Sequence, residues 1–85
     1  MSPSNLLLVQ PRVDSTDVLS VVQGVLDAEN GAIACYQQII KACDGKDHVT
    51  QDLAIKLQAD EEAHRCLFEG FRKSLRKQSA SAAER

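Results

Sequence analysis

The stretch CDGKDH, residues 43–48, decides the fold of this chain of 85 residues. Gly45 suits the left-handed backbone conformation that commonly ends a helix, and Asp47 is a residue type preferred at the N-cap of a following helix. The connection Asp44-Gly45-Lys46 is very short, so the helices on either side of it should be antiparallel neighbours. The stretch therefore predicts a helical hairpin.

Long helical patterns flank this turn on both sides. Apolar residues recur at three- and four-residue spacing through residues 15–44 and again through residues 47–77, as they do on one face of a helix. They are Val18, Val22, Val25/Leu26, Ala32/Ile33, Ile40 and Cys43 in the first segment, and Leu53, Leu57, Leu67/Phe68, Phe71 and Leu75 in the second. Each helix should be roughly 40–45 Å long at about 1.5 Å per residue. The N-cap candidates for the first helix are Asp14, Ser15 and Thr16.

The two ends of the chain lack this periodicity. Residues 1–13 contain Pro3 and Pro11, and we expect an extended or disordered arm there. Residues 78–85 are small and polar, which predicts a frayed, disordered tail. The predicted organisation is thus one hairpin over residues 14–77 between two irregular ends.

Composition supports an all-α chain and narrows its surroundings. The chain has four Gly and two Pro, which is few for the many turns of an all-β domain. The formal net charge is −2 and no basic arm is present, so we expect no nucleic-acid partner. The apolar run at residues 6–9 is far too short to span a bilayer, and we expect no membrane partner. Three cysteines without a secretory signal favour a cytoplasmic location.

The predicted hairpin is small for a stable domain. A chain of this length rarely gains more than roughly 3–5 kcal/mol from its own core, and oligomerisation is a usual remedy. Two helices side by side also leave most of each apolar stripe facing outward, where a second hairpin would cover it. We therefore expect an all-α, two-helix antiparallel hairpin that dimerises into a four-helix bundle, as a homo-oligomer of two or a higher even number of subunits.

Three polar residues lie on these apolar stripes. Glu29 lies one heptad from Val22 and from Tyr36, while Glu61 and His64 are three residues apart and so are neighbours on one helix face. Burying a lone carboxylate is very costly, whereas carboxylates and a neutral imidazole suit iron, manganese or zinc. A two-fold dimer would double the set to four carboxylates and two imidazoles, whose charge two divalent ions would balance. This is the ligand inventory of carboxylate-bridged helical bundles.

The same segments resemble the ferritin-like superfamily. Residues 26–36 (LDAENGAIACY) resemble the third helix of bacterioferritin-related and Dps-like domains, residues 45–53 (GKDHVTQDL) their turn into the fourth helix, and residues 59–64 (ADEEAH) their Glu-x-x-His segment. The resemblance covers about residues 14–75. It implies a ferritin-like four-helix bundle with metal ligation by Glu29, Glu61 and His64.

The resemblance also carries expectations about function. Full members have all four helices in one chain, whereas this chain corresponds to the second pair; it also resembles encapsulated ferritins, whose two-helix chains build the metal site between subunits. This implies a di-metal protein, with iron favoured and manganese or zinc as alternatives. It further implies a ferroxidase, iron-storage or oxidative-stress role, with Tyr36 near the metals as a candidate catalytic residue.

Alternatives to this interpretation remain open at this point. Periodicity alone does not choose among Asp60, Glu61 and Glu62 as the partner of His64; the resemblance selects Glu61. Glu61 and His64 could also be an ordinary surface pair worth a few tenths of a kcal/mol. The whole chain could be a non-catalytic dimerisation module, or a truncated ferritin-like remnant whose site no longer works.

The three cysteines give a further alternative. The usual role of residues such as Cys35, Cys43 and Cys66 is that of small buried apolar side chains. A thiol redox protein is the competing hypothesis, and the lack of a Cys-x-x-Cys motif counts against it.

Overall fold

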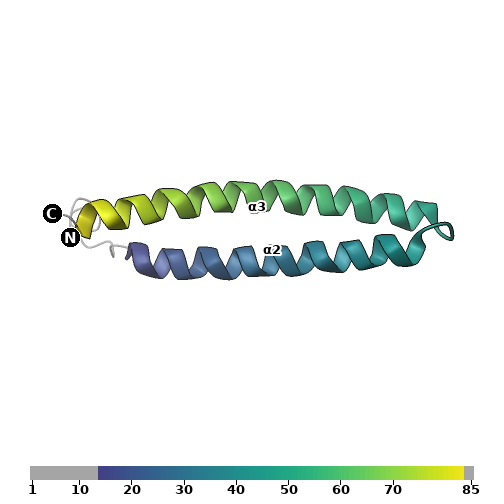
Figure 1. Cartoon of the computed structure of the whole chain (residues 1–85), viewed down its shortest axis with the longest axis horizontal. Helices are drawn as coiled ribbons and strands as arrows, with labels where there is room; N and C mark the ends of the chain where they lie inside the picture. Colours follow the sequence, from purple (N-terminus) through teal and green to yellow (C-terminus); the bar gives the residue numbers. More distant parts are fainter. Residues whose placement is uncertain (1–13, 84–85) are drawn as a thin grey trace, which may run out of the picture.

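The computed structural model describes residues 14–83, which form two long α-helices (Figure 1). Helix α2 spans Ser15–Cys43 and helix α3 spans His48–Ala83. The helices lie side by side and run in opposite directions, joined at one end by a tight turn. The predicted antiparallel hairpin is confirmed. The arm predicted for residues 1–13 lies outside the described residues.

The turn and the helix caps follow from local residue chemistry. Gly45 has a φ of 71°, the left-handed conformation expected after the end of α2. Asp47 caps α3, because its side chain accepts hydrogen bonds from the Thr50 amide at 3.0 Å and from the Thr50 hydroxyl at 2.6 Å. At the start of α2, the side chain of Asp14 accepts a hydrogen bond from the Thr16 amide at 2.8 Å.

Helix α3 is longer than the sequence pattern predicted. It continues to Ala83, whereas we expected it to end near residue 77 and to be followed by a disordered tail over residues 78–85. The segment is polar, but it contains neither Gly nor Pro, and alanine has the highest helix propensity of all residues. Small polar composition therefore did not predict the end of the helix. Residues 84–85 lie outside the described part of the chain.

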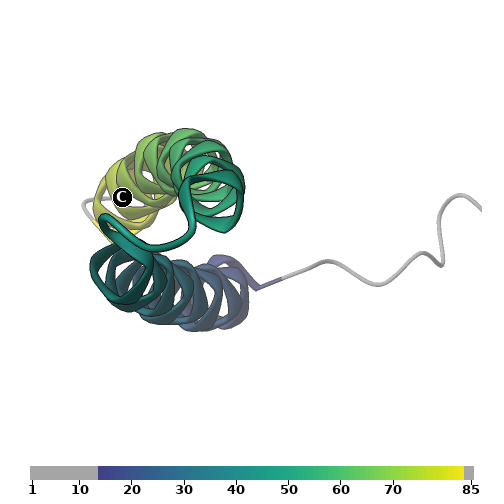
Figure 2. The same ribbon diagram turned by 90° about the vertical axis from the view of Figure 1, so that its right-hand side faces the viewer.

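The hairpin has a thin core. The buried apolar side chains are Val22, Leu26, Ile33, Ala54 and Leu75. Three of them form one cluster near the open end of the hairpin, with partly buried apolar neighbours from both helices packed against it. Seen along the helices in Figure 2, α2 and α3 form a single pair, and among residues 14–83 each helix has the other as its one helical neighbour.

Many of the large apolar side chains face outward. The side chains of Leu67, Leu53 and Phe71 are 72%, 57% and 48% exposed. Most of the exposed apolar positions share one side of the hairpin by helical periodicity, and we call this surface the apolar flank: Val21 and Ile39 on α2, and Leu53, Leu57, Leu67 and Phe71 on α3. Such a surface is what a second hairpin would cover, and dimerisation remains a prediction. Between residues 14 and 83, neither helix has a stretch apolar enough to cross a bilayer.

Candidate metal centre

The three polar residues that lie on the apolar stripes meet midway along the hairpin. Glu29 extends from α2, and Glu61 and His64 extend from α3. Each offers one ligand atom, and these three atoms all lie within 4.8 Å of one another. Within residues 14–83, this is the one group of three or more acidic, histidine or cysteine side chains close enough to hold a metal ion. We call it the ligand cluster.

Helix geometry accounts for the cluster. Residues three apart on a helix are neighbours on its surface, and Nδ1 of His64 lies 3.8 Å from Oε2 of Glu61. The Glu61 side chain is 26% exposed and the His64 side chain 54% exposed, so the imidazole is at the edge of the helix contact. Glu29 is half-buried and completes the group from the antiparallel helix. The cluster therefore depends on the alignment of α2 with α3.

The two carboxyl groups perturb each other. The pKa of Glu29 is raised above its usual 4.5, first by side-chain hydrogen bonding with Glu61, then by partial burial and by repulsion from the Glu61 charge. His64 acts in the opposite direction, because its positive form lowers the pKa of Glu29. The Glu29 carboxyl therefore holds its proton to a higher pH than an isolated glutamate does, as expected for two acids held close together.

One oxygen of the cluster lacks a partner. Oε2 of Glu29 is buried and makes no hydrogen bond, and an unpaired buried polar atom is costly. A metal ion would pair with such an oxygen, and two carboxylates with an imidazole fit iron, manganese or zinc. The residues present thus fit a metal. Three ligand atoms fill only part of the coordination shell of such an ion, so further ligands must come from another chain, from water or from substrate.

The neighbouring acids are placed elsewhere. Asp60 and Glu62 are exposed and do not belong to the ligand cluster. Glu62 instead accepts a hydrogen bond from the Gln58 amide at 3.2 Å. Among the three consecutive acids, the structure places Glu61 against Glu29 and His64, which is the choice that the resemblance implied.

Tyr36 lies on the same side of α2 but apart from the cluster. It is half-buried and follows Glu29 by seven residues, about 10 Å along the helix axis. This separation places Tyr36 about two turns from Glu29 along α2. Its candidate catalytic role remains a prediction.

The cysteines differ from the buried role expected of them. Cys35 and Cys66 are exposed, Cys43 is half-buried, and all three are free thiols. Cys35 immediately precedes the half-buried Tyr36, and consecutive helical residues point about 100° apart, so its side chain turns outward. Closeness in sequence to the ligands therefore did not bring either exposed thiol to the cluster.

Sequence reasoning missed a row of polar side chains between the helices. Nη1 of Arg65 donates to Oδ1 of Asn30 at 3.0 Å, and Nη1 of Arg72 donates to Oε1 of Gln23 at 2.8 Å. The sequence does contain a pattern that reflects this row: amide side chains recur every seven residues on α2, and long polar side chains recur every seven residues on α3. Only the alignment of the two helices shows that these residues pair.

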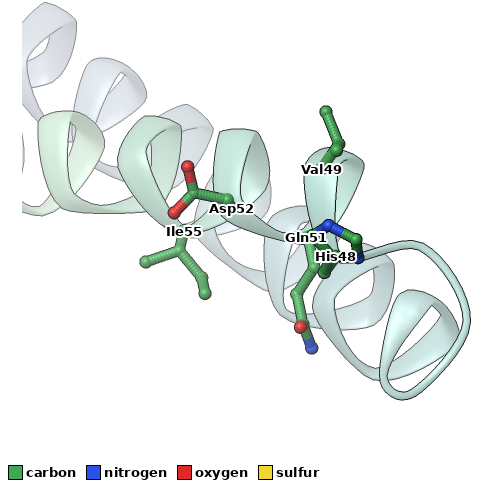
Figure 3. A pocket seen from close by; sticks show the side chains of 5 residues that line it. All are labelled: His48, Val49, Gln51, Asp52 and Ile55. Atoms are coloured by element: carbon green, nitrogen blue, oxygen red, sulfur yellow. The ribbon is translucent and has the colours of Figure 1, made fainter.

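Two hollows in the surface of residues 14–83 lie away from the ligand cluster. A hollow of about 410 Å³ opens at the start of α3 and is lined by His48, Val49, Gln51, Asp52 and Ile55 (Figure 3). A second, of about 220 Å³, is lined by Ile40, Ile55, Gln58, Ala59 and Glu62. Neither is lined by a residue of the ligand cluster, so neither adds a wall to the candidate metal centre.

Comparison with known proteins gives one match. A family model described as a ferritin-like domain matches residues 2–80. Searches of curated proteins and of solved structures each found no match.

Proposed function

Since the chain belongs to the ferritin-like domain family, we propose that it binds a pair of divalent metal ions, iron first of all, at a site shared by two copies of the chain. Iron binding is the general expectation for this family. Manganese and zinc are the alternatives, because the same ligand types accept them. The proposed activity is oxidation of ferrous iron, with iron storage or protection from oxidative stress as its possible outcome.

The observation that supports this proposal is the ligand cluster itself. Two carboxylates and an imidazole from two helices lie within 4.8 Å of one another, and one buried carboxylate oxygen has no partner. Half-buried acids at such a distance repel each other unless a proton or a cation intervenes. Repulsion from the Glu61 charge is one cause of the raised pKa of Glu29, and a bound cation would offset that repulsion.

The position of the cluster supports a shared site. On α3, His64 lies seven residues after Leu57, three before Leu67 and seven before Phe71, so it falls on the apolar flank. A second hairpin that covers this flank would therefore also cover the cluster. Under two-fold symmetry it would contribute a second Glu29, Glu61 and His64, giving the ligand inventory of a carboxylate-bridged pair of ions.

In this proposal, the chain's own residues supply geometry. Glu29, Glu61 and His64 would hold the metals, and coordination positions left open would admit dioxygen or peroxide. Iron, when bound, would supply the one-electron redox chemistry. Tyr36, two turns after Glu29 on the same side of α2, is proposed as a candidate catalytic residue.

The test compares two adjacent acids. The purified metal-free chain is loaded anaerobically with Fe(II), its metal content is measured, and air is then admitted while near-ultraviolet absorption from bound ferric iron is followed. We expect about one iron per chain in the wild type and in Glu62→Gln, and loss of both metal and absorption in Glu61→Gln. Absence of bound metal in the wild type, or equal loading of the two variants, would contradict the proposal.

The apolar flank by itself also fits a module that dimerises without metal. This second function predicts that added metal leaves the melting temperature unchanged, whereas a ligand that binds only the folded state raises it. The two hypotheses therefore differ in a thermal melt of the wild type with and without Fe(II) or Zn(II).

A further inference from the structure

A row of polar side chains runs along the hairpin on the side away from the apolar flank. We call it the polar seam. It consists of Gln23, Asn30, Gln37 and Asp44 on α2, and of Gln51, Gln58, Arg65 and Arg72 on α3. On each helix, its members follow one another by seven residues, which keeps them on one side of a helix over this length.

Three cross-pairs of the polar seam are joined by hydrogen bonds. The donor–acceptor distances are 2.8 Å for Arg72 to Gln23, 3.0 Å for Arg65 to Asn30 and 3.2 Å for Gln51 to Asp44. Each step of seven residues along α2 is matched by a step of seven in the opposite direction along α3. A slip of one helix against the other would break all three bonds together. Paired polar residues at a helix contact specify alignment in this way.

The middle pair lies at the level of the ligand cluster. Asn30 directly follows Glu29, and Arg65 directly follows His64. Consecutive residues differ by about 1.5 Å along a helix axis and by about 100° around it. The Asn30–Arg65 bond and the ligand cluster therefore share one level of the hairpin, on opposite sides of the line where the helices touch.

Without a cation, the cluster joins the helices only through Glu29 and Glu61, where hydrogen bonding between the two carboxyl groups is opposed by repulsion between their charges. Outside the cluster, the nearest side-chain hydrogen bond between the helices is the Asn30–Arg65 bond; the other two bonds of the polar seam reach α2 seven residues before Asn30 and fourteen residues after it. Metal ligands must lie within about 0.2 Å of their ideal distances, so a small slide of α3 would spoil the site.

We propose that Asn30 and Arg65 are positioning residues for the metal centre: their hydrogen bond holds Glu29 in line with Glu61 and His64 before a metal binds. This inference rests on the proposed function and adds to it residues that do not touch the metal. The Arg72–Gln23 pair has the same chemistry but lies one heptad away. It should stabilise the hairpin without setting the ligand distances, and it is a matched control.

The test is a pair of double-mutant cycles with Co(II) as the probe metal. One cycle uses Asn30→Ala and Arg65→Gln, the other Gln23→Ala and Arg72→Gln, each with its double variant. Cycles are needed because removing Arg65 also removes a positive charge near the cluster, and the cycle cancels that effect. Co(II) affinity and the visible Co(II) spectrum are measured, with helicity followed by circular dichroism.

We expect Asn30→Ala to weaken Co(II) binding about tenfold, the lower end of what outer residues of metal sites contribute, and to alter the Co(II) spectrum. The Asn30/Arg65 cycle should show coupling in affinity, and Asn30→Gln, which keeps an amide acceptor, should recover much of the loss. The control cycle should lower the melting temperature and leave affinity and spectrum unchanged. Equal affinity losses in the two cycles would overturn the inference. Failure of the wild type to bind Co(II) would refute the proposed metal site itself.

Discussion

Replacing Leu67 by serine should separate the proposed dimer into single hairpins. Leu67 belongs to the apolar flank and is 72% exposed, the highest value among the large apolar side chains of residues 14–83. It lies three residues after His64, so a hairpin that covers the ligand cluster would also cover Leu67. In a two-fold dimer, the substitution removes this contact twice.

The exposed fraction sets the size of the effect. Burying a whole leucine side chain contributes about 1.5–3 kcal/mol, and 72% of that is about 1–2 kcal/mol per copy. The dimer should therefore lose about 2–4 kcal/mol. At about 1.4 kcal/mol per factor of ten, its dissociation constant should rise roughly 30- to 1000-fold.

Sedimentation velocity over a range of concentrations measures this shift directly. Ile55→Ser is the matched control, because Ile55 is 49% exposed but lines the hollows with Gln51 and Gln58 on the side of the polar seam. We expect this control to sediment like the wild type. The assignment of the apolar flank as the dimer surface would be refuted if Leu67→Ser dimerised as tightly as the wild type, or if Ile55→Ser separated the subunits equally.

Three further predictions follow from the site and the turn. Glu29→Gln should leave the metal-free melting temperature unchanged or raise it, because it removes repulsion from Glu61, and added Fe(II) should no longer raise it. In the wild type, the raised pKa of Glu29 in the folded state means that this residue stabilises the metal-free fold at low pH. That stabilisation should be lost as pH rises through the raised pKa, which thermal melts at a series of pH values would show. In the same melts, the melting temperature of Glu29→Gln should depend less on pH. Metal affinity should rise with pH, since metals need the deprotonated carboxylate. Gly45→Ala should lower the free energy of unfolding in urea by about 1–2 kcal/mol, the cost of a left-handed non-glycine residue, because Gly45 has a φ of 71° and an added Cβ would meet no atom within 4 Å. An unchanged urea midpoint would show that the turn tolerates another conformation.

The hairpin was predictable because its turn is specified locally. Gly45 and Asp47 act through their own backbone and side-chain preferences, and these do not depend on the rest of the fold. The end of α3 was less predictable, since nothing in residues 78–83 stops a helix. Burial was harder still. In a pair of helices the contact is a narrow line, so the small Ala54 is buried while the larger Leu53 beside it is 57% exposed.

The ligand cluster was partly predictable. The spacing of Glu61 and His64 places them on one helix face, and this follows from helical geometry alone. The choice of Glu61 over its acidic neighbours needed either a resemblance or coordinates, because all three acids lie within one turn. The contact with Glu29 depends on how far α2 is shifted along α3, a quantity that periodicity within one helix does not contain.

The polar seam could not be recognised for a related reason. Asparagine, glutamine and arginine on helices are ordinarily solvent-facing. A seven-residue repeat of them therefore does not predict hydrogen bonds between two helices until the alignment of the helices is known. The pairing of Asn30 with Arg65 is a property of two segments 35 residues apart in sequence. Long-range alignment is therefore the common reason why both the Glu29 contact and the polar seam needed the structure.

The two sides of the hairpin differ in a way that links metal binding to assembly. On the polar seam, Arg65 and Arg72 donate hydrogen bonds to side chains of α2 within one chain, whereas the apolar flank leaves large apolar side chains exposed. The ligand cluster beside this flank holds a buried Glu29 oxygen without a hydrogen-bond partner. If one second hairpin completes both, metal must tighten the dimer by the same factor by which dimerisation tightens metal binding, because the coupling is reciprocal. Titrating metal into dilute monomer and into concentrated dimer measures one factor, and sedimentation with and without metal measures the other. Two factors near one would mean that each chain binds its metal alone, and the shared site would then be wrong even if the ligands are right.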